Sequence, residues 1–357
     1  MKTYLDLKEE VWDKNICSGC GACVSVCPTD NIYFKEESPV KFKCEMCACV
    51  ISPIDEPMEH PVSAEFCKVV LYDVPCSACY NACPRSEERV IPYSTSGMGK
   101  YIEIVKGKST IDIKNAQSGG VVSAILINAF EEGLIDGAIV VKEDKWTMEP
   151  ESFLATSKED IINSAGSRYN WNVPILKVLK DAVMVKKLKN IAVVGTPCVM
   201  DGIYQIMASD NDLLKPFKKA IRLKIGLFCF ETYDYEKMLK ILKENKINPW
   251  DVKKMEIEKG KLVIKLMNGD SVSFNLKDIE DAMRVGCKVC DDFTGIVADI
   301  SVGNVGSPSN YSTVILRNEW GKGFFDRACL NGYIEYDNDV DVGSIEKLVK
   351  LKRKRLE

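Results

Sequence analysis

Apolar positions in the larger, C-terminal part of the chain recur with helical and strand spacings in turn. The segment "SGGVVSAILINAFEEGLIDGAIVVK" predicts a helix from about Gly120 to Glu132, a glycine stop at Gly133 and a buried strand at 138–141. "NVPILKVLKDAVMVKKLKNIAVVG" predicts another helix and buried strand, and "AIRLKIGLFCF" and "YEKMLKILKE" predict the next strand and helix. Such alternation favours an α/β domain.

Strict alternation of apolar and polar residues appears in "KKMEIEKGKLVIKLMNGDSVSFNL". It predicts two or three antiparallel strands with turns at Lys259-Gly260 and Asn268-Gly269. A helix before Cys287, strands at "ADISVG" and "STVILRN", and an amphipathic helix at "SIEKLVKLKRKRLE" complete the pattern. The predicted fold is an α/β domain with a mixed sheet. The basic end of the last helix fits the preference for cations at a helix C terminus.

The N-terminal part lacks such periodicity and is rich in cysteine instead. Eleven of the sixteen cysteines lie between Cys17 and Cys83. The following "VIPYSTSGMGKY" has the Pro, Ser and Gly content of a linker. We expect a metal-stabilised domain over residues 1–93, followed by one catalytic unit in two parts, residues 94–215 and 216–357.

Composition and charge exclude some classes of function. Hydrophobic residues make up 46% of the chain, and the net charge of −4 argues against nucleic-acid partners and general membrane adhesion. The most apolar run, "VVSAILINAF", is about half as long as a membrane span. The first residues, "MKTYLDLKEEVW", lack the apolar core of a signal peptide. We expect a cytoplasmic protein, either free or at the periphery of a membrane complex.

A single histidine, His60, accompanies the sixteen cysteines. This disfavours zinc sites with paired histidine ligands and cysteine–histidine catalysis. A disulfide framework is typical of small secreted domains rather than of a chain of 357 residues. The thiols therefore point to iron–sulfur clusters or to all-thiolate zinc.

The segment "ICSGCGACVSVCP" carries the complete bacterial ferredoxin signature C-x2-C-x2-C-x3-C-P at Cys17, Cys20, Cys23 and Cys27. In two-cluster ferredoxins the first three cysteines bind one cluster and the fourth binds the other. By the same exchange, Cys83 from the second motif completes the first cluster. This predicts a small α+β bacterial-ferredoxin-like domain at the N terminus.

The second motif, "PCSACYNACPRS", keeps Cys76, Cys79 and Cys83-Pro84 but has Asp73 where its first cysteine belongs. Cys27, Cys76 and Cys79 then supply three ligands of the second cluster. The fourth comes from Cys67, the nearest upstream cysteine, or from "KCEMCAC", which contains Cys44, Cys47 and Cys49.

Three thiols remain after two clusters are filled. They are either unligated or part of a third cluster with one non-cysteine ligand, for which Asp73 is a candidate; a surface turn is the alternative for this aspartate. The N-terminal domain is therefore expected to hold two or three [4Fe-4S] clusters.

Four cysteines of the α/β part follow or end predicted elements. Cys198 follows a strand in "VVGTPC", Cys229 ends "KIGLFCF", and Cys287 and Cys290 form a C-x2-C pair. Strand ends of an open α/β sheet face a common crevice, so these thiols are expected to converge on a further cluster. Cys329, in the helical "FFDRACLNG", is expected to be a core residue.

The segment "NAQSGGVVSAIL" opens a helix with two glycines after Ser118. Exposed amides at a helix N terminus make a phosphate site, although a plain helix cap has the same pattern. "GTPC" and "SVGNVGS" add two turns of small residues after strands.

The motifs "SGGVVSAILINAFEEGLIDGAIV", "GSRYNW", "VVGTPC", "IGLFCFETYDY" and "GCKVCDDFTGIVADISVGNVGS" together resemble the family of beta subunits of coenzyme F420-dependent hydrogenases and dehydrogenases, over about residues 95–335. The N-terminal module resembles those of F420-linked formate dehydrogenase, the input subunit of F420H2 dehydrogenase and F420-dependent sulfite reductase. The resemblance implies an archaeal flavoprotein of methanogenesis, with FAD, one cluster in the flavin-binding domain, and F420 as substrate.

The resemblance also assigns residues. It implies FAD contacts for Ser118, Gly119, Gly120, Val121, Gly195, Thr196 and Pro197, and contacts to FAD or F420 for Ser167, Arg168 and Tyr169. It implies pocket positions for Asp292, Phe293, Asp299 and Ser301, for which a structural role is the alternative. Arg168, Tyr169, Asp292 and Phe293 are the expected catalytic residues. Cys198, Cys229, Cys287 and Cys290 are implied as cluster ligands, which gives three or four clusters in the whole chain.

The expected function is electron transfer between F420 and a partner redox subunit, such as that of a hydrogenase, a formate dehydrogenase or a membrane F420H2 dehydrogenase. Three alternatives stay open. They are a ferredoxin-dependent flavin reductase with another substrate, a non-catalytic iron–sulfur wiring subunit, and a scaffold built on all-thiolate zinc.

Overall fold

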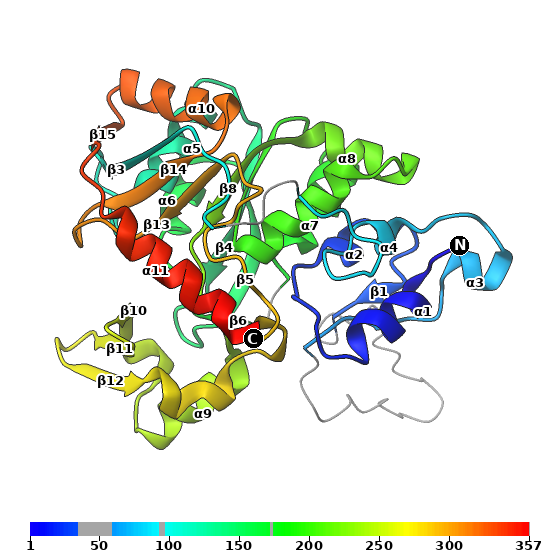
Figure 1. Cartoon of the computed structure of the whole chain (residues 1–357), viewed down its shortest axis with the longest axis horizontal. Helices are drawn as coiled ribbons and strands as arrows, with labels where there is room; N and C mark the ends of the chain where they lie inside the picture. The colour runs from blue at the N-terminus through cyan, green and yellow to red at the C-terminus, as the bar shows by residue number, and fades with distance from the viewer. Residues whose placement is uncertain (35–58, 93–96, 172–173, 357) are drawn as a thin grey trace.

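The computed structural model describes residues 1–34, 59–92, 97–171 and 174–356, and its centre is a mixed eight-stranded sheet (Figure 1). The strand order is β15-β3-β14-β13-β8-β7-β4-β5. The four inner strands, β13, β8, β7 and β4, are parallel, and the outer strands are antiparallel to their neighbours. Their bounds are β3 Glu103–Ser109, β4 Gly137–Glu143, β5 Pro150–Ala155, β7 Ile191–Gly195, β8 Ile221–Leu227, β13 Ile300–Gly303, β14 Ser312–Leu316 and β15 Ile334–Asp337. The predicted mixed sheet is confirmed.

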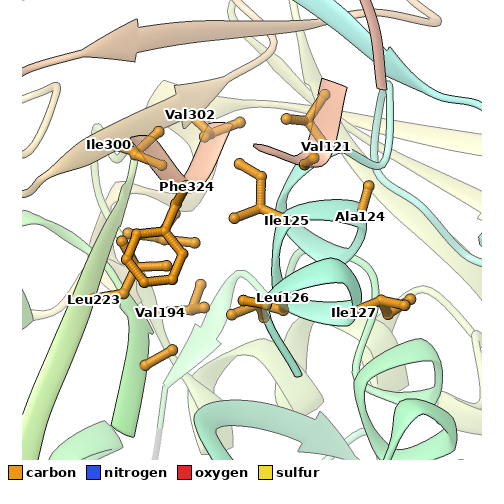
Figure 2. Packing of buried hydrophobic residues seen from close by; sticks show 14 of the residues in the cluster. Val121, Ala124, Ile125, Leu126, Ile127, Val194, Leu223, Ile300, Val302 and Phe324 are labelled. Carbon is orange, nitrogen blue, oxygen red and sulfur yellow. The ribbon is translucent and has the colours of Figure 1, made fainter. Parts of the chain in front are cut away.

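Helices cover both faces of this sheet. Helices α5 (Val121–Glu131), α6 (Lys158–Asn163) and α10 (Glu319–Leu330) pack on one face, and α7 (Pro197–Ala208) and α8 (Lys215–Ala220) pack on the other. Successive residues of the inner strands alternate between the two cores, because side chains in a strand point to opposite faces. Figure 2 shows part of the first core, the cluster of buried apolar side chains that includes Ile125, Val194 and Phe324.

A smaller antiparallel sheet lies beside the large one, as its alternating sequence predicts. It contains β10 (Val252–Glu258), β11 (Lys261–Leu266) and β12 (Ser271–Asn275), and α9 (Tyr235–Glu244) packs against it. Two short parallel strands, β6 (Asn170–Trp171) and β9 (Tyr233–Asp234), lie next to α9. The C-terminal helix α11 runs over 342–353 and is confirmed.

Two predicted elements differ in the structure. The segment expected to form one helix after residue 173 is a 3-10 turn, Ile175–Val178, followed by a π turn, Asp181–Val185. Ser152 and Ser25 donate hydrogen bonds to the backbone carbonyls of Ile175 and Leu176, respectively, so these carbonyls have partners outside a regular helix. The helix expected before Cys287 is likewise a 3-10 helix, Leu276–Ala282. "GTPC" is the expected turn after β7, and α7 begins within it at Pro197.

The N-terminal module consists of short elements joined by cysteine-bearing loops. They are α1 Tyr4–Leu7, a π turn Lys8–Trp12, α2 Ala22–Ser25, β1 Ile32–Tyr33, β2 Val62–Ser63, α3 Lys68–Tyr72 and α4 Ala78–Asn81. Helices α2 and α4 both begin after a left-handed residue, Gly21 (φ 83°) and Ser77 (φ 55°), so the two cysteine motifs fold alike. Alanines of α2 and α4 pack into the α7 core, which fixes the module against the sheet domain. Among the described helices, none has the length and apolarity needed to cross a membrane.

Candidate active site

A cavity of about 640 Å³ opens at the carboxyl edge of the large sheet. Its wall comes from the segments that follow β3, β4, β7, β8 and β13, together with the turn 164–170 and the end of α11. This is the edge at which open α/β sheets bind their ligands, because the loops after parallel strands meet there.

The N termini of α5 and α7 face this cavity. Ser118, Gly120, Val121 and the run 195–197 are among its lining residues. The N-cap residues of both helices, Gly120 and Thr196, make no side-chain capping bond, so a side chain does not satisfy the first amides of either helix. Such amides can bind phosphate oxygens.

Gly119 lies behind the cavity wall. Its amide donates to Ser312 Oγ (3.1 Å), and a Cβ there would lie 2.4 Å from the carbonyl oxygen of Gly107. Only a residue without a side chain allows the loop to approach β3 this closely. Gly119 therefore lets this turn lie close against β3, behind the cavity wall.

The turn 164–170 brings polar groups to the cavity. Arg168 Nη1 donates to the carbonyls of Ser164 (3.2 Å), Ala165 (2.8 Å) and Gly166, and burial lowers the pKa of Arg168. Within the described residues, Arg168 Nε and Asn170 Oδ1 are buried without a partner. Neither atom has accessible surface, so both are unpaired polar groups inside the wall and not groups that the wall presents to a ligand.

Ser167 and Tyr169 line the same part of the wall. Burial raises the pKa of Tyr169 to about 12, so its phenol stays protonated and can donate a hydrogen bond. Asn170 also lies in the motif "GSRYNW", but the sequence analysis assigns it no role.

Of the four remaining pocket residues expected from the sequence, the structure places only Phe293 in the wall. Its ring packs on Phe228 and Phe230, with centroids 5.3 and 6.2 Å away. Asp292, in contrast, accepts the backbone amides of Thr294 (2.9 Å), Gly295 (2.8 Å) and Ile296 (2.8 Å) with its carboxylate. This carboxylate holds the loop together, which corrects the expected catalytic position.

Asp299 and Ser301 are corrected in the same way. Asp299 accepts a hydrogen bond from the amide of Lys224 (2.9 Å) and pairs with the ammonium of Lys224 (3.2 Å). Ser301 is fully buried and accepts a hydrogen bond from Arg317 Nε (2.6 Å). Neither side chain is in the cavity wall. Both form their bonds behind the wall, Asp299 with Lys224 of β8 and Ser301 with Arg317, which follows β14.

The four cysteines of the sheet domain do converge. Cys198 lies in the first turn of α7, Cys229 lies two residues after β8, and Cys287 and Cys290 flank the end of a 3-10 turn. All four line the cavity, and beside burial the charges of Cys287 and Cys290 raise the pKa of both Cys198 and Cys229. Burial raises the pKa of Cys198 to about 12 and that of Cys229 well above its ordinary value.

The cysteines of the N-terminal module form two further groups. Cys17, Cys20, Cys23 and Cys83 are mutual neighbours, as the ligand exchange of ferredoxins predicts. The second group, Cys27, Cys67, Cys76 and Cys79, surrounds a small cavity. The structure thus brings Cys67 to the position left open by Asp73, which is exposed and outside this group. Cys44, Cys47 and Cys49 lie outside the described residues.

In the described ranges, no three ligand side chains are close enough together to hold a single metal ion. A cubane places iron and sulfide between its four thiolates, so it needs them farther apart. Metal binding also deprotonates buried thiols whose pKa is raised.

The sheet-domain thiols and the first module group meet at a close junction. Cys198 Sγ lies 4.0 Å from the carbonyl oxygen of Ser18, which also accepts a hydrogen bond from Arg284 (2.8 Å). A Cβ on Gly286 would lie 2.0 Å from the carbonyl oxygen of Cys17, so this glycine permits the approach. The cavity and the three thiol groups therefore form one continuous series.

Buried cations surround this series. Arg284 is 1% exposed, and so is Lys352, whose ammonium donates to the carbonyls of Cys229 and Asp292. Burial opposes the charge of Arg85, but Cys290, Asp201 and Cys198 raise its pKa. The sequence does not single out these three cations. Arg85 and Lys352 lie in quoted segments whose patterns concern other residues, and Arg284 lies outside any quoted motif.

Comparisons with known proteins agree with this arrangement. Two family models describe the N-terminal and C-terminal parts of the coenzyme F420 hydrogenase/dehydrogenase beta subunit. The first matches residues 104–180 and the second matches residues 188–341. Residues 10–33 match the 4Fe-4S binding domain.

Individual relatives cover most of the chain. The uncharacterized protein MJ1349 of Methanocaldococcus jannaschii is 66% identical over 356 residues, which are 100% of this chain and 98% of that protein. A subunit of the F(420)H(2) dehydrogenase of Methanosarcina mazei is 32% identical over 349 residues, 97% of this chain and 91% of the relative. A chain in a structure of the F420-reducing [NiFe] hydrogenase complex from Methanosarcina barkeri matches with a TM-score of 0.70 and 32% identity, covering 74% of this chain and 92% of that chain. The chain belongs to the family of coenzyme F420 hydrogenase/dehydrogenase beta subunits and carries an N-terminal 4Fe-4S binding domain.

Proposed function

We propose that this chain is an iron–sulfur flavoprotein that transfers electrons between coenzyme F420 and a series of [4Fe-4S] clusters leading to a partner redox subunit. The observation that carries the proposal is the continuous series formed by the cavity and three groups of four thiols. The series joins a site large enough for organic cofactors to sites suited to single-electron carriers.

The cavity has the features that FAD requires. The uncapped N termini of α5 and α7 suit the diphosphate, and the volume of about 640 Å³ suits a ligand of this size. When bound, FAD exchanges a hydride with a deazaflavin and single electrons with clusters.

The chain's own residues then bind and orient. Ser118–Val121 and Gly195–Pro197 hold the phosphates, Ser167, Arg168 and Tyr169 contact FAD or F420, and Phe293 forms the wall near the thiols. Since the phenol of Tyr169 stays protonated, it serves as a hydrogen-bond donor and not as a base.

Cys198, Cys229, Cys287 and Cys290 hold the cluster next to the cavity. Cys17, Cys20, Cys23 and Cys83 hold the next, and Cys27, Cys67, Cys76 and Cys79 hold the last. Cys67 and Cys76 are only partly buried, which brings the last cluster to the surface where a partner can exchange electrons. The partner is a redox subunit of the kind found in hydrogenase, formate dehydrogenase or membrane F420H2 dehydrogenase complexes.

The test is F420-dependent reduction of a viologen dye by the purified, iron-reconstituted protein. We expect turnover with reduced F420 and none with NADH. Full FAD and iron content without F420 turnover would contradict the proposal. Zinc in place of iron, with no visible absorption, would point to a scaffold instead.

A further inference from the structure

The C-terminal helix α11 places a charged side chain deep in the molecule. The family match ends at residue 341, so α11 lies beyond it. Ile345 and Val349 pack with Met98 and Phe293, and Leu348 and Leu351 reach the cavity. Figure 1 shows α11 running from the edge of the large sheet toward the small sheet. The helix therefore forms part of the cavity wall.

Lys352, near the end of α11, is 1% exposed. Its ammonium donates to the carbonyl oxygens of Cys229 (2.6 Å) and Asp292 (2.7 Å). These carbonyls belong to the loop that carries one thiol and to the loop that follows Cys290. One side chain therefore connects the two segments that supply three of the four thiols of the group.

Two carbonyls satisfy hydrogen bonds of this ammonium but do not neutralise its charge. A buried cation needs an anionic neighbour to offset its desolvation. The ion pairs that the described residues form do not include one between Lys352 and a carboxylate. Burial opposes its charge, yet Cys290 and Cys229 raise its pKa above the ordinary value. The cysteines of this group, as thiolates, are the anionic neighbours that suit the buried ammonium of Lys352.

We propose that Lys352 is a positioning residue whose fixed charge raises the reduction potential of the cluster held by Cys198, Cys229, Cys287 and Cys290. The inference rests on the proposed function, since it needs a cluster at these thiols. Reduction adds a negative charge to the cluster, and a nearby cation in a low-dielectric site stabilises that charge. The effect makes this cluster a better electron acceptor from the cavity.

The experiment is an EPR-monitored redox titration of the reconstituted full chain. The transition of this cluster is identified by its loss in Cys229→Ser. In Lys352→Met, which keeps the length of the side chain without its charge, we expect about a tenfold lower equilibrium constant for reduction, or about 59 mV toward negative potential. The midpoint potentials of the other clusters should not change. Lys350→Met is the matched control, since Lys350 lies on the same helix but is exposed, and it should leave every transition unchanged.

Two more variants separate charge from structure. Lys352→Arg keeps the charge and should keep the potential, whereas Lys352→Gln keeps a donor without charge and should shift it as methionine does. Loss of this cluster's iron in the Met and Gln variants, but not in the Arg variant, equally supports a role for the charge.

An unmoved transition in Lys352→Met, a wild-type potential in Lys352→Gln, or equal effects in all three variants would overturn the inference. Retention of every transition in Cys229→Ser would instead refute the cluster assignment in the proposed function. The two failures are therefore distinguishable.

Discussion

The N-terminal module and the sheet domain are stabilised by different means. The core on one face of the sheet contains 26 buried apolar residues, and none of them is a cysteine. Among the described residues, the module's own cluster contains nine, and four of these are the cysteines Cys23, Cys27, Cys79 and Cys83. The sheet domain can therefore fold by apolar burial alone, whereas the module needs its metals.

This difference also separates the two parts of the site. The cavity is built on strand ends and helix N termini, which the sheet holds in place. The two thiol groups of the module lie on loops that only short helices interrupt. The chain thus combines a preformed cavity with thiol groups whose geometry depends on ligation.

Removal of iron is expected to have the largest effect, and to affect one region. Anaerobic chelation should abolish amide hydrogen-exchange protection in α2, α4 and the cysteine loops, while β7 and β8 stay protected. Exchange measured by mass spectrometry checks this. Equal loss of protection in both regions would show that the sheet domain depends on metal as well.

Replacement of one cysteine tests the ligand set of the second ferredoxin motif, in which Asp73 stands where the first cysteine belongs. Cys67→Ser should remove about four irons per chain, since one cluster loses a ligand. Cys329→Ser is the control, because Cys329 packs against the apolar core of the sheet and should cost no iron. Full iron content in Cys67→Ser would move the fourth ligand upstream, to Cys44 or Cys47.

The junction between the two regions can be disturbed without touching a thiol. In Gly286→Ala the new Cβ would lie 2.0 Å from the carbonyl oxygen of Cys17, so the two segments must separate, at a cost of about 1–3 kcal/mol. Electron transfer from the cavity to the module should slow, which stopped-flow absorption measures.

Gly323→Ala in α10 is the matched control for that substitution. A Cβ there meets no atom within 4 Å, and alanine is the better helix former, by about 0.5–1 kcal/mol. A slowdown of the same size in both variants would contradict the assignment of the junction.

A smaller effect concerns pH and the module alone. Burial alone would raise the pKa of Glu10, but the hydrogen bonds from Lys2 (2.8 Å), the amide of Glu87 (3.0 Å) and Tyr80 (2.7 Å) hold it below its ordinary value. A lowered folded-state pKa contributes stability above about pH 4.3, and this stability is lost as the pH falls through the folded value.

Glu10→Gln should therefore lower the stability of the module by about 1–3 kcal/mol at neutral pH and by less in acid. Thermal unfolding at pH 7 and pH 4 measures the difference. A penalty that is as large at pH 4 as at pH 7 would show that the charge of Glu10 is not involved.

The sequence was sufficient wherever a pattern is local. Periodicity identified α5, the inner strands and the three-stranded sheet, and spacing identified the first ferredoxin motif and the convergence of Cys198, Cys229, Cys287 and Cys290. The sequence was insufficient where contacts between distant segments of the chain determine the position of a side chain. Only the fold shows that the carboxylate of Asp292 is occupied by three backbone amides. For the fourth ligand of the second group the sequence left alternatives open, and the fold places Cys67, its first candidate, beside Cys27.

The buried cations illustrate the same limit. Lys352 follows the pattern of an amphipathic helix whose basic end is solvated, and only the packing of α11 against the cavity buries it. The regular helix predicted after residue 173 does not form, for a related reason. The hydroxyl groups of two serines that are distant in the sequence donate hydrogen bonds to backbone carbonyls of this segment.

The central claim is that electrons pass from F420 at the cavity through the sheet-domain thiols to the module. Its most direct test mixes reduced F420 anaerobically with the FAD- and iron-loaded protein and follows each cluster by EPR, in the wild type and in Cys229→Ser. We predict that the module clusters are reduced rapidly in the wild type and much more slowly in the variant. No cluster reduction in the fully loaded wild type, or equally fast reduction in Cys229→Ser, would contradict the account.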